Sequence, residues 1–167
     1  YLKTGIYNII SPSKNCISSA MNVGHPSNLA RIVALYGGIM NESGTILKSP
    51  NLAAMRNDFF GISVSDEITR ETIASCYEKH RVLLEPHGSV AWAGLREFLE
   101  KHPECSNELC FSAETAHPAK FRDEIKVILN IEPVLPESLR MAESQSEEFL
   151  SLENNYDLLH QFILQNY

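Results

Sequence analysis

The chain has 167 residues, of which 44% are hydrophobic and 21% are charged. This composition fits one packed domain and argues against a wholly disordered chain. The net charge of −7 and the pI near 5.3 argue against a nucleic-acid partner, which requires a basic face. No apolar run is long enough to predict a membrane-spanning helix, so no membrane partner is expected.

Four scattered cysteines without a CxxC pair predict no disulfide framework, and they favour a reducing cytoplasm as the location. The first residues lack the basic and apolar regions of a signal peptide. The chain starts without Met, in what looks like the middle of a structured region. We therefore expect a fragment of a longer protein.

Small and polar residues predict loops over residues 1–24. A helix is predicted from Pro26 to the Gly37-Gly38 pair, because Pro suits the first helical position and Gly the end. Its apolar face has the spacing i, i+3, i+4, i+7 and comprises Leu29, Ile32, Val33 and Tyr36. A shorter helix is expected over residues 48–57.

The apolar run over residues 59–64 predicts a strand. Ser65 or Asp66 can cap a following helix over residues 67–80. We expect this helix to be buried through Ile68, Ile73, Cys76 and Tyr77. Residues 82–84 are a short apolar stretch, interpreted as an edge of the sheet.

A helix is predicted over residues 88–101, with one face formed by Ala91, Gly94, Leu95, Phe98 and Leu99. Residues 108–112 predict another strand. The next predicted helix covers residues 118–129 and packs through Phe121, Ile125, Ile128 and Leu129.

Alternating strands and helices indicate an α/β fold for residues 1–130. Residues 131–167 are predicted to form an acidic extension. Six acidic residues and one basic residue between 132 and 153 suggest a solvated surface segment. Residues 155–165 are expected to form a closing amphipathic helix.

Three segments place Pro or Gly beside a His and a hydroxyl at a predicted helix start: 19–28, 84–90 and 114–121. Ligands bind at the carboxyl ends of strands in α/β sheets, and anions bind at helix amino termini. Each segment alone is more often a simple helix cap than a binding site.

Taken together, the three segments resemble the carboxyl-terminal part of the threonine synthase family, in its bacterial and fungal branch. The matching stretches are residues 20–28 (AMNVGHPSN), 85–90 (EPHGSV) and 115–121 (TAHPAKF), and the resemblance covers about residues 1–130. The third stretch matches the family pattern at every position. The chain departs from that pattern at Asn22 (usually Asp), His25 (usually Asn) and Glu85 (usually Asp).

The resemblance implies part of a fold-type II domain, similar to the tryptophan synthase β chain, with helices packed on a mostly parallel sheet. The implied cofactor of the full-length enzyme is pyridoxal 5'-phosphate (PLP). The implied reaction converts O-phospho-L-homoserine and water to L-threonine and phosphate, with O-phosphohomoserine as the small-molecule partner. Within this chain, Thr115 is the implied cofactor-binding residue, with its hydroxyl facing the pyridine nitrogen.

The family's Schiff-base lysine lies in the amino-terminal half, in a Ser-Phe-Lys-Asp context, and none of the seven lysines here has that context. The chain also lacks a glycine-rich phosphate cup. Lys120 is interpreted as a scaffold residue, because the family keeps its catalytic lysine in addition to this one. We therefore assign no catalytic residue and expect an inactive fragment. Its expected partner is the missing amino-terminal half, and exposed apolar surface allows self-association.

Alternative classes have weaker signals. His102, Cys105 and Cys110 lie close in sequence, but their spacing is not a usual zinc pattern, so no metal is expected. A hydrolase based on Cys16 or Cys76 lacks a Gly-x-Ser-x-Gly elbow. A non-catalytic homologue that serves as an interaction module remains open, because of the changes at Asn22 and His25.

Overall fold

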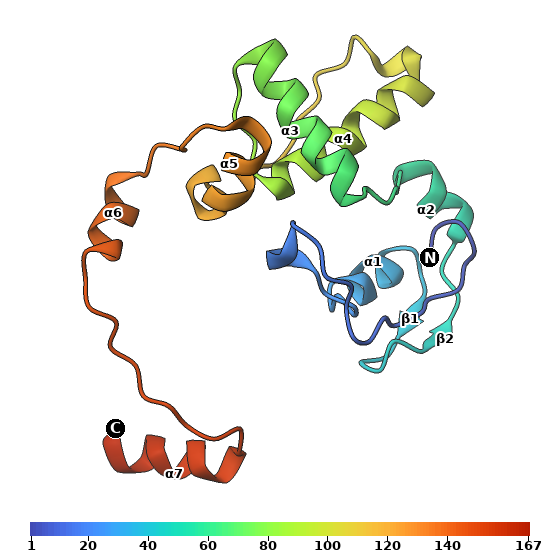
Figure 1. Ribbon diagram of the computed structural model, residues 1–167. Coiled ribbons are helices and arrows are strands. Elements are labelled where there is room, and N and C mark those ends of the chain that lie inside the picture. Colours follow the sequence, from blue (N-terminus) through green and yellow to red (C-terminus); the bar gives the residue numbers. More distant parts are fainter. The chain divides into compact units, whose positions relative to one another are not determined.

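The computed structural model describes all 167 residues, apart from the side chain of Met21. The chain forms two compact units, Tyr1–Pro133 and Val134–Tyr167. The α-helices and strands of the first unit are α1 (Leu29–Leu35), β1 (Ile39–Met40), β2 (Ile46–Lys48), α2 (Leu52–Asp58), α3 (Asp66–His80), α4 (Pro86–Lys101) and α5 (Arg122–Leu129) (Figure 1).

Helices α3 and α4 pack side by side, and α5 contacts α3 (Figure 1). The side chains of Ile73 on α3 and Ile125 on α5 are completely buried. The Ser89 hydroxyl of α4 donates a 2.8 Å hydrogen bond to the Thr69 carbonyl of α3. Apolar burial and this buried hydrogen bond together fix how α4 lies on α3.

Helix α3 begins as predicted, because the Ser65 side chain accepts a hydrogen bond from the Ile68 amide at 3.3 Å. The prediction that Ile68 is buried was wrong, since this side chain is 46% exposed. The buried residues of α3 are instead Thr69, Thr72, Ile73 and Cys76. Two of these residues are threonines, which a pattern of purely apolar residues overlooks.

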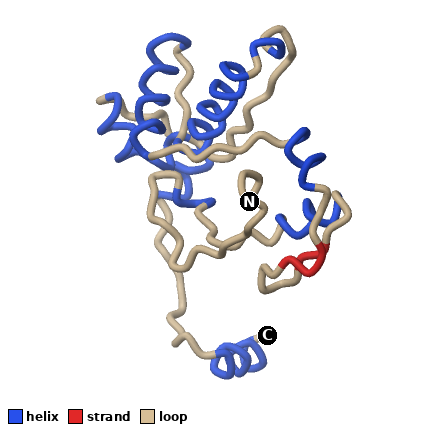
Figure 2. Tube along the Cα trace, turned by 90° about the vertical axis from the view of Figure 1, so that its right-hand side faces the viewer, coloured by secondary structure: helices blue, strands red, loops and turns tan.

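The described residues contain a single sheet, in which β1 and β2 pair antiparallel as a hairpin (Figure 2). This hairpin was not predicted. Its turn includes Gly44 at φ +80°, a backbone conformation that glycine adopts readily. The Asn41 side chain accepts from the Thr45 amide at 2.8 Å and closes the turn.

The strands predicted over residues 59–64, 82–84 and 108–112 are not formed in the described chain, and neither is the predicted parallel sheet. These segments run as connections between helices (Figure 2). A strand requires a neighbouring backbone that supplies its hydrogen bonds, and no described segment pairs with these three. Apolar composition alone suggested that these segments are strands, but a strand forms only where a pairing partner is present.

Several helix starts also differ from the prediction. Lys48 belongs to β2, so the helix predicted over residues 48–57 begins only at Leu52, where Asn51 caps it. The first helix starts at Leu29, three residues after Pro26. Residues Pro118–Phe121 form a 3-10 helix, labelled η3, before α5 begins.

The second unit contains two helices, α6 (Glu137–Glu143) and α7 (Tyr156–Asn166). Helix α7 was predicted, and its Asn155 cap accepts hydrogen bonds from the Asp157 and Leu158 amides. Helix α6 was missed, because it lies in a stretch that the acidic composition marked as irregular surface. Across the described chain, no helix is long and apolar enough to cross a membrane.

Candidate functional site

The second sequence segment, residues 85–90, forms the first turn of α4. The Glu85 carboxylate is completely buried and caps this turn by accepting 2.8 Å hydrogen bonds from the His87 and Gly88 amides. Glu85 Oε2 also lies 2.6 Å from His87 Nδ1. A carboxylate accepts hydrogen bonds, so Nδ1–H donates. Glu85 therefore fixes both the helix start and the orientation of the imidazole.

The third segment meets this turn through Glu114. Its Oε1 atom accepts a 2.8 Å hydrogen bond from the Glu85 amide. The same side chain lies against Gly88, where an added Cβ would be only 3.0 Å from Glu114 Cγ. The two motif segments, 29 residues apart in sequence at this bond, are thus in direct contact.

Thr115 follows Glu114 directly and is an exposed residue. After it, His117 caps η3 by accepting a 3.1 Å hydrogen bond from the Ala119 amide. Pro118 and Ala119 are buried beneath the turn. Thr115, the residue that the sequence selected, is therefore an exposed residue shortly before this buried turn.

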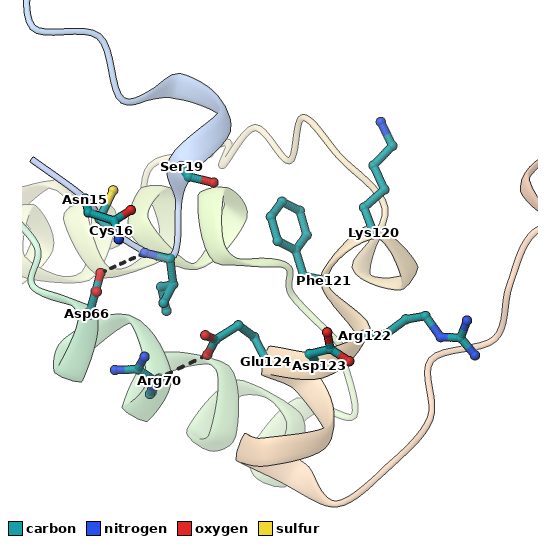
Figure 3. A pocket seen from close by; sticks show the side chains of 11 residues that line it. Asn15, Cys16, Ser19, Asp66, Arg70, Lys120, Phe121, Arg122, Asp123 and Glu124 are labelled. Atoms are coloured by element: carbon teal, nitrogen blue, oxygen red, sulfur yellow. Dashed lines mark hydrogen bonds and ion pairs between the residues drawn. The ribbon is translucent and has the colours of Figure 1, made fainter. Parts of the chain in front are cut away.

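A cavity of about 560 Å³ lies where the first and third segments approach each other (Figure 3). Its lining includes Asn15, Cys16 and Ser19 on one side and Lys120 and Phe121 on another. Three acidic and three basic side chains also take part: Asp66, Asp123, Glu124, Arg70, Lys120 and Arg122. With this balance of charge, the cavity shows no preference for an anion.

Two contacts fix the walls of this cavity (Figure 3). The Ile17 amide donates to Asp66 Oδ1 at 3.1 Å, which ties the amino-terminal loop to α3. Arg70 Nε lies 3.4 Å from Glu124 Oε2, which joins α3 to α5. Lys120 extends away from this ion pair (Figure 3) and is exposed.

His25, one of the departures from the family pattern, has a structural role. Its Nε2 lies 2.9 Å from the Glu42 carbonyl oxygen, and its Nδ1 lies 2.6 Å from the Tyr7 hydroxyl. A carbonyl can only accept, so Nε2–H donates to Glu42, and Nδ1 shares a hydrogen bond with the Tyr7 hydroxyl. Both ring nitrogens thus connect the amino-terminal loop to the β1–β2 hairpin.

The other candidate classes find little support in the described residues. Among these residues, no group of three or more His, Cys, Asp or Glu side chains is placed to hold a metal ion. Cys76 is buried, and desolvation followed by the Glu114 charge raises the pKa of its thiol. A protonated, inaccessible thiol is a poor nucleophile.

Comparison with known proteins points to one family. A family model described as "Threonine synthase, C-terminal" matches residues 89–163. Threonine synthase of Buchnera aphidicola (subsp. Acyrthosiphon pisum) is 34% identical over 142 residues, which are 84% of this chain and 28% of that protein. Threonine synthase of Haemophilus influenzae is 30% identical over 166 residues, with coverages of 99% and 34%.

A solved structure agrees with these sequence matches. The crystal structure of PLP-bound threonine synthase from Brucella melitensis has a TM-score of 0.75 and 25% identity to this chain. It aligns with 98% of this chain, which corresponds to 37% of the Brucella chain. Over nearly its whole length, the chain is similar to part of the threonine synthases.

The chain spans about a third of the length of the threonine synthases that it matches. It corresponds to their carboxyl-terminal region. The expected fold class, part of an α/β fold-type II domain, is supported by the likeness to the Brucella threonine synthase. Within the described residues, the sheet of that class is represented only by the β1–β2 hairpin.

Sequence reasoning selected Thr115 but missed the residues that hold the segment around it. Glu114 and His87 were noted only as members of motifs, and the contact of Glu114 with the Glu85 amide was not anticipated. The available signal was Pro86, which favours the first helical position and so marks Glu85 as the residue directly before the helix.

Proposed function

We propose that this chain is the carboxyl-terminal part of a PLP-dependent threonine synthase. The full-length enzyme would convert O-phospho-L-homoserine and water to L-threonine and phosphate. The observation that carries the proposal is Thr115, exposed in the family's most specific motif and directly linked to the buried start of α4 through Glu114. Similarity to the carboxyl-terminal region of threonine synthases supports the same reaction.

The residues of this chain fit one part of a PLP site. PLP, when bound, supplies the electron sink for the elimination and addition. The Thr115 hydroxyl would face the pyridine nitrogen, where a neutral group leaves that nitrogen largely unprotonated. Exposure of Thr115 is consistent with such a contact, since a ligand can reach it.

The chain lacks the group that would bind PLP covalently. None of its lysines follows Ser-Phe or precedes Asp: Lys3, Lys14, Lys48, Lys79, Lys101, Lys120 and Lys126. The nucleophilic lysine and the phosphate cup would come from the amino-terminal part that the longer relatives carry. This part is the proposed partner, a cytoplasmic location is proposed for the enzyme, and the isolated chain is expected to be inactive.

Absorption spectroscopy tests the expected inactivity. We expect PLP added to the isolated chain to keep the spectrum of the free aldehyde, with no band for a lysine-linked cofactor. A saturable band that disappears when one lysine is replaced would overturn the proposal that the catalytic lysine lies outside this chain. Lys120→Ala is the first variant to compare, because its side chain is accessible at the cavity.

The role of Thr115 is tested in a protein that joins this chain to the amino-terminal part of its relatives, called here the assembled enzyme. Thr115→Val removes the hydroxyl at nearly constant volume. We expect it to weaken PLP binding by about tenfold, as for loss of one hydrogen bond. Thr115→Ser keeps the hydroxyl and should bind PLP nearly as well as the unchanged enzyme. Equal affinities of the Val and Ser variants would contradict the assignment.

The same measurement addresses the alternative of a non-catalytic homologue. If the assembled enzyme binds PLP and releases phosphate from O-phosphohomoserine, the chain supports catalysis. An assembled protein that folds but does neither would favour an interaction module. The change at His25 does not favour that alternative, because both ring nitrogens have structural partners.

A further inference from the structure

The first turn of α4 contacts both ends of the segment that carries Thr115. At the beginning of the segment, Glu114 accepts a 2.8 Å hydrogen bond from the Glu85 amide. At its end, the Phe121 ring packs against the His87 ring, with centroids 5.3 Å apart. The Thr115 loop is therefore held at two points by a single helical turn.

The turn itself has little freedom to move. Glu85 and His87 are 0% and 8% exposed, and Glu85 binds the His87 ring as well as two amides. Buried hydrogen bonds to a charged group are costly to break, because the group loses its partners without regaining water. A residue that contacts this turn is therefore held in place by it.

Gly88 allows Glu114 to approach the first turn of α4 closely. A Cβ at this position would lie 3.0 Å from Cγ and 3.3 Å from Cβ and Cδ of Glu114. Any larger residue at position 88 must displace Glu114 or tilt the start of the helix. The missing side chain thus lets the Glu114 stem lie directly on the helix backbone.

The position of Glu114 limits that of Thr115. Consecutive Cα atoms are about 3.8 Å apart, so Thr115 is one peptide unit from the anchored residue. Groups that bind a cofactor must be held to within about 0.5 Å of their productive geometry. For an exposed loop residue, contacts made by its neighbours contribute to such precision.

We infer that Glu114, together with the Glu85–His87 pair, positions Thr115 for its contact with the cofactor. The inference rests on the proposed function, since it gives Thr115 its role there. None of the three residues need touch the cofactor. They act through the loop: Glu114 fixes its start and His87 supports its end through Phe121.

The imidazole of His87, which supports the end of the loop, has one unusual feature. Its Nε2 atom is buried, and within the described part of the chain it has no hydrogen-bond partner. With Nδ1–H donated to Glu85, a neutral ring presents only a lone pair at Nε2. The ring is thus held by the Glu85 carboxylate at Nδ1 and by its tilted contact with the Phe121 ring.

The first experiment measures hydrogen exchange in the 167-residue chain. The Glu85 amide lies outside the helical hydrogen bonds, and Glu114 is its partner, so its exchange reports on this contact alone. We expect Glu114→Ala to accelerate its exchange by about tenfold or more. Glu114→Gln retains a carbonyl acceptor and should restore most of the protection.

Glu108→Ala is the matched control, because Glu108 is an exposed acidic residue in the same connection. It should leave the Glu85 amide unchanged. Gly88→Ala provides a second route if Glu114→Ala does not fold, and should also accelerate this exchange. Unchanged exchange in both Glu114→Ala and Gly88→Ala would overturn the inference.

The second experiment uses the assembled enzyme and separates positioning from stability. We expect Glu114→Ala to weaken PLP binding about as much as Thr115→Val, and Glu114→Gln to restore the affinity. The melting temperatures of the variants, compared without PLP, should be unchanged. If Thr115→Val weakens binding and Glu114→Ala does not, positioning fails and the proposed function stands. If Thr115→Val itself has no effect, the proposed function fails.

Discussion

His25 connects two parts of the first unit that are distant in sequence, through Tyr7 on one side and the Glu42 carbonyl on the other. Replacing His25 by Ala removes both hydrogen bonds from a partly buried site. We expect the free energy of unfolding to fall by about 1–2 kcal/mol. Urea denaturation measures the change. A His25→Ala chain as stable as the unchanged one would show that these bonds contribute nothing.

Burial raises the pKa of the Tyr7 hydroxyl above its ordinary value of 10.0. A raised pKa means that the folded chain favours the protonated phenol. Below pH 10 both states are protonated and this contribution is fully present; as pH rises through 10 the unfolded state loses its proton first, and stability falls. We expect Tyr7→Phe to lose less stability than the unchanged chain between pH 9 and 11, as measured by denaturation.

The Tyr36 hydroxyl donates a 2.6 Å hydrogen bond to Asp58, and this bond is the main cause that lowers the carboxyl pKa of Asp58 below 3.8. Asn57 makes the second, smaller contribution. We expect Tyr36→Phe to raise the Asp58 pKa towards its ordinary value, and Asn57→Ala to raise it less. Titration by NMR gives both values. A larger shift in the Asn57 variant would reverse the assigned order.

At the scale of elements, residues 109–112 form a connection without regular structure, and this connection has little support. Leu109 and Phe111 are 82% and 84% exposed. No backbone hydrogen bond within the described chain involves the amides of residues 109–112. We expect these amides to exchange rapidly in the isolated chain, while those of Ile73 and Cys76 on α3 exchange slowly. Slow exchange over 109–112 would indicate a partner for this segment, such as a second copy of the chain.

Helices were easier to predict from the sequence than strands, for a physical reason. The start of α3 depends on Ser65 and the following amides, all within one local stretch. A strand depends on a second segment, so the apolar runs at 59–64 and 108–112 gave no information about pairing. The β1–β2 hairpin was missed, although Gly44 provides a local turn signal.

The same difference applies to the site. Thr115 could be selected because a short motif carries it. Its support could not, because the Glu114–Glu85 contact joins residues 29 positions apart. The burial of Glu85 was equally unexpected, since an isolated Glu is usually exposed. Spatial contacts of this kind require the packing of α4 on α3, which local patterns do not contain.

At the scale of the whole molecule, the buried apolar side chains all belong to the first unit. Within the described chain they are Val33, Met55, Ile73, Cys76, Leu84, Ala93, Ala119 and Ile125. Residues 134–167 contain no buried residue. The core of residues 1–133 is therefore complete without the second unit, and each unit is expected to respond separately to cleavage and truncation.

This independence predicts where a protease cuts first. Residues 146–153 connect α6 to α7 without regular structure, and Glu147, Glu148 and Glu153 within them are exposed. We expect a Glu-specific protease to cut there before it cuts in α3 or α4, because cleavage requires an extended, accessible backbone. Mass spectrometry of early products identifies the sites. Gln substitutions at the three positions provide the control, and should slow the first cut.

Truncation after Pro133 follows from the same argument. Removing residues 134–167 deletes no buried apolar side chain, so the melting temperature should change by no more than about 2–4 °C. The α3 amides should keep their slow exchange. A large loss of stability would mean that the exposed apolar side chains of α7, such as Leu159 and Ile163, cover part of the first unit in solution. The comparison therefore determines whether the acidic unit contributes to the fold, or becomes useful only in the assembled enzyme.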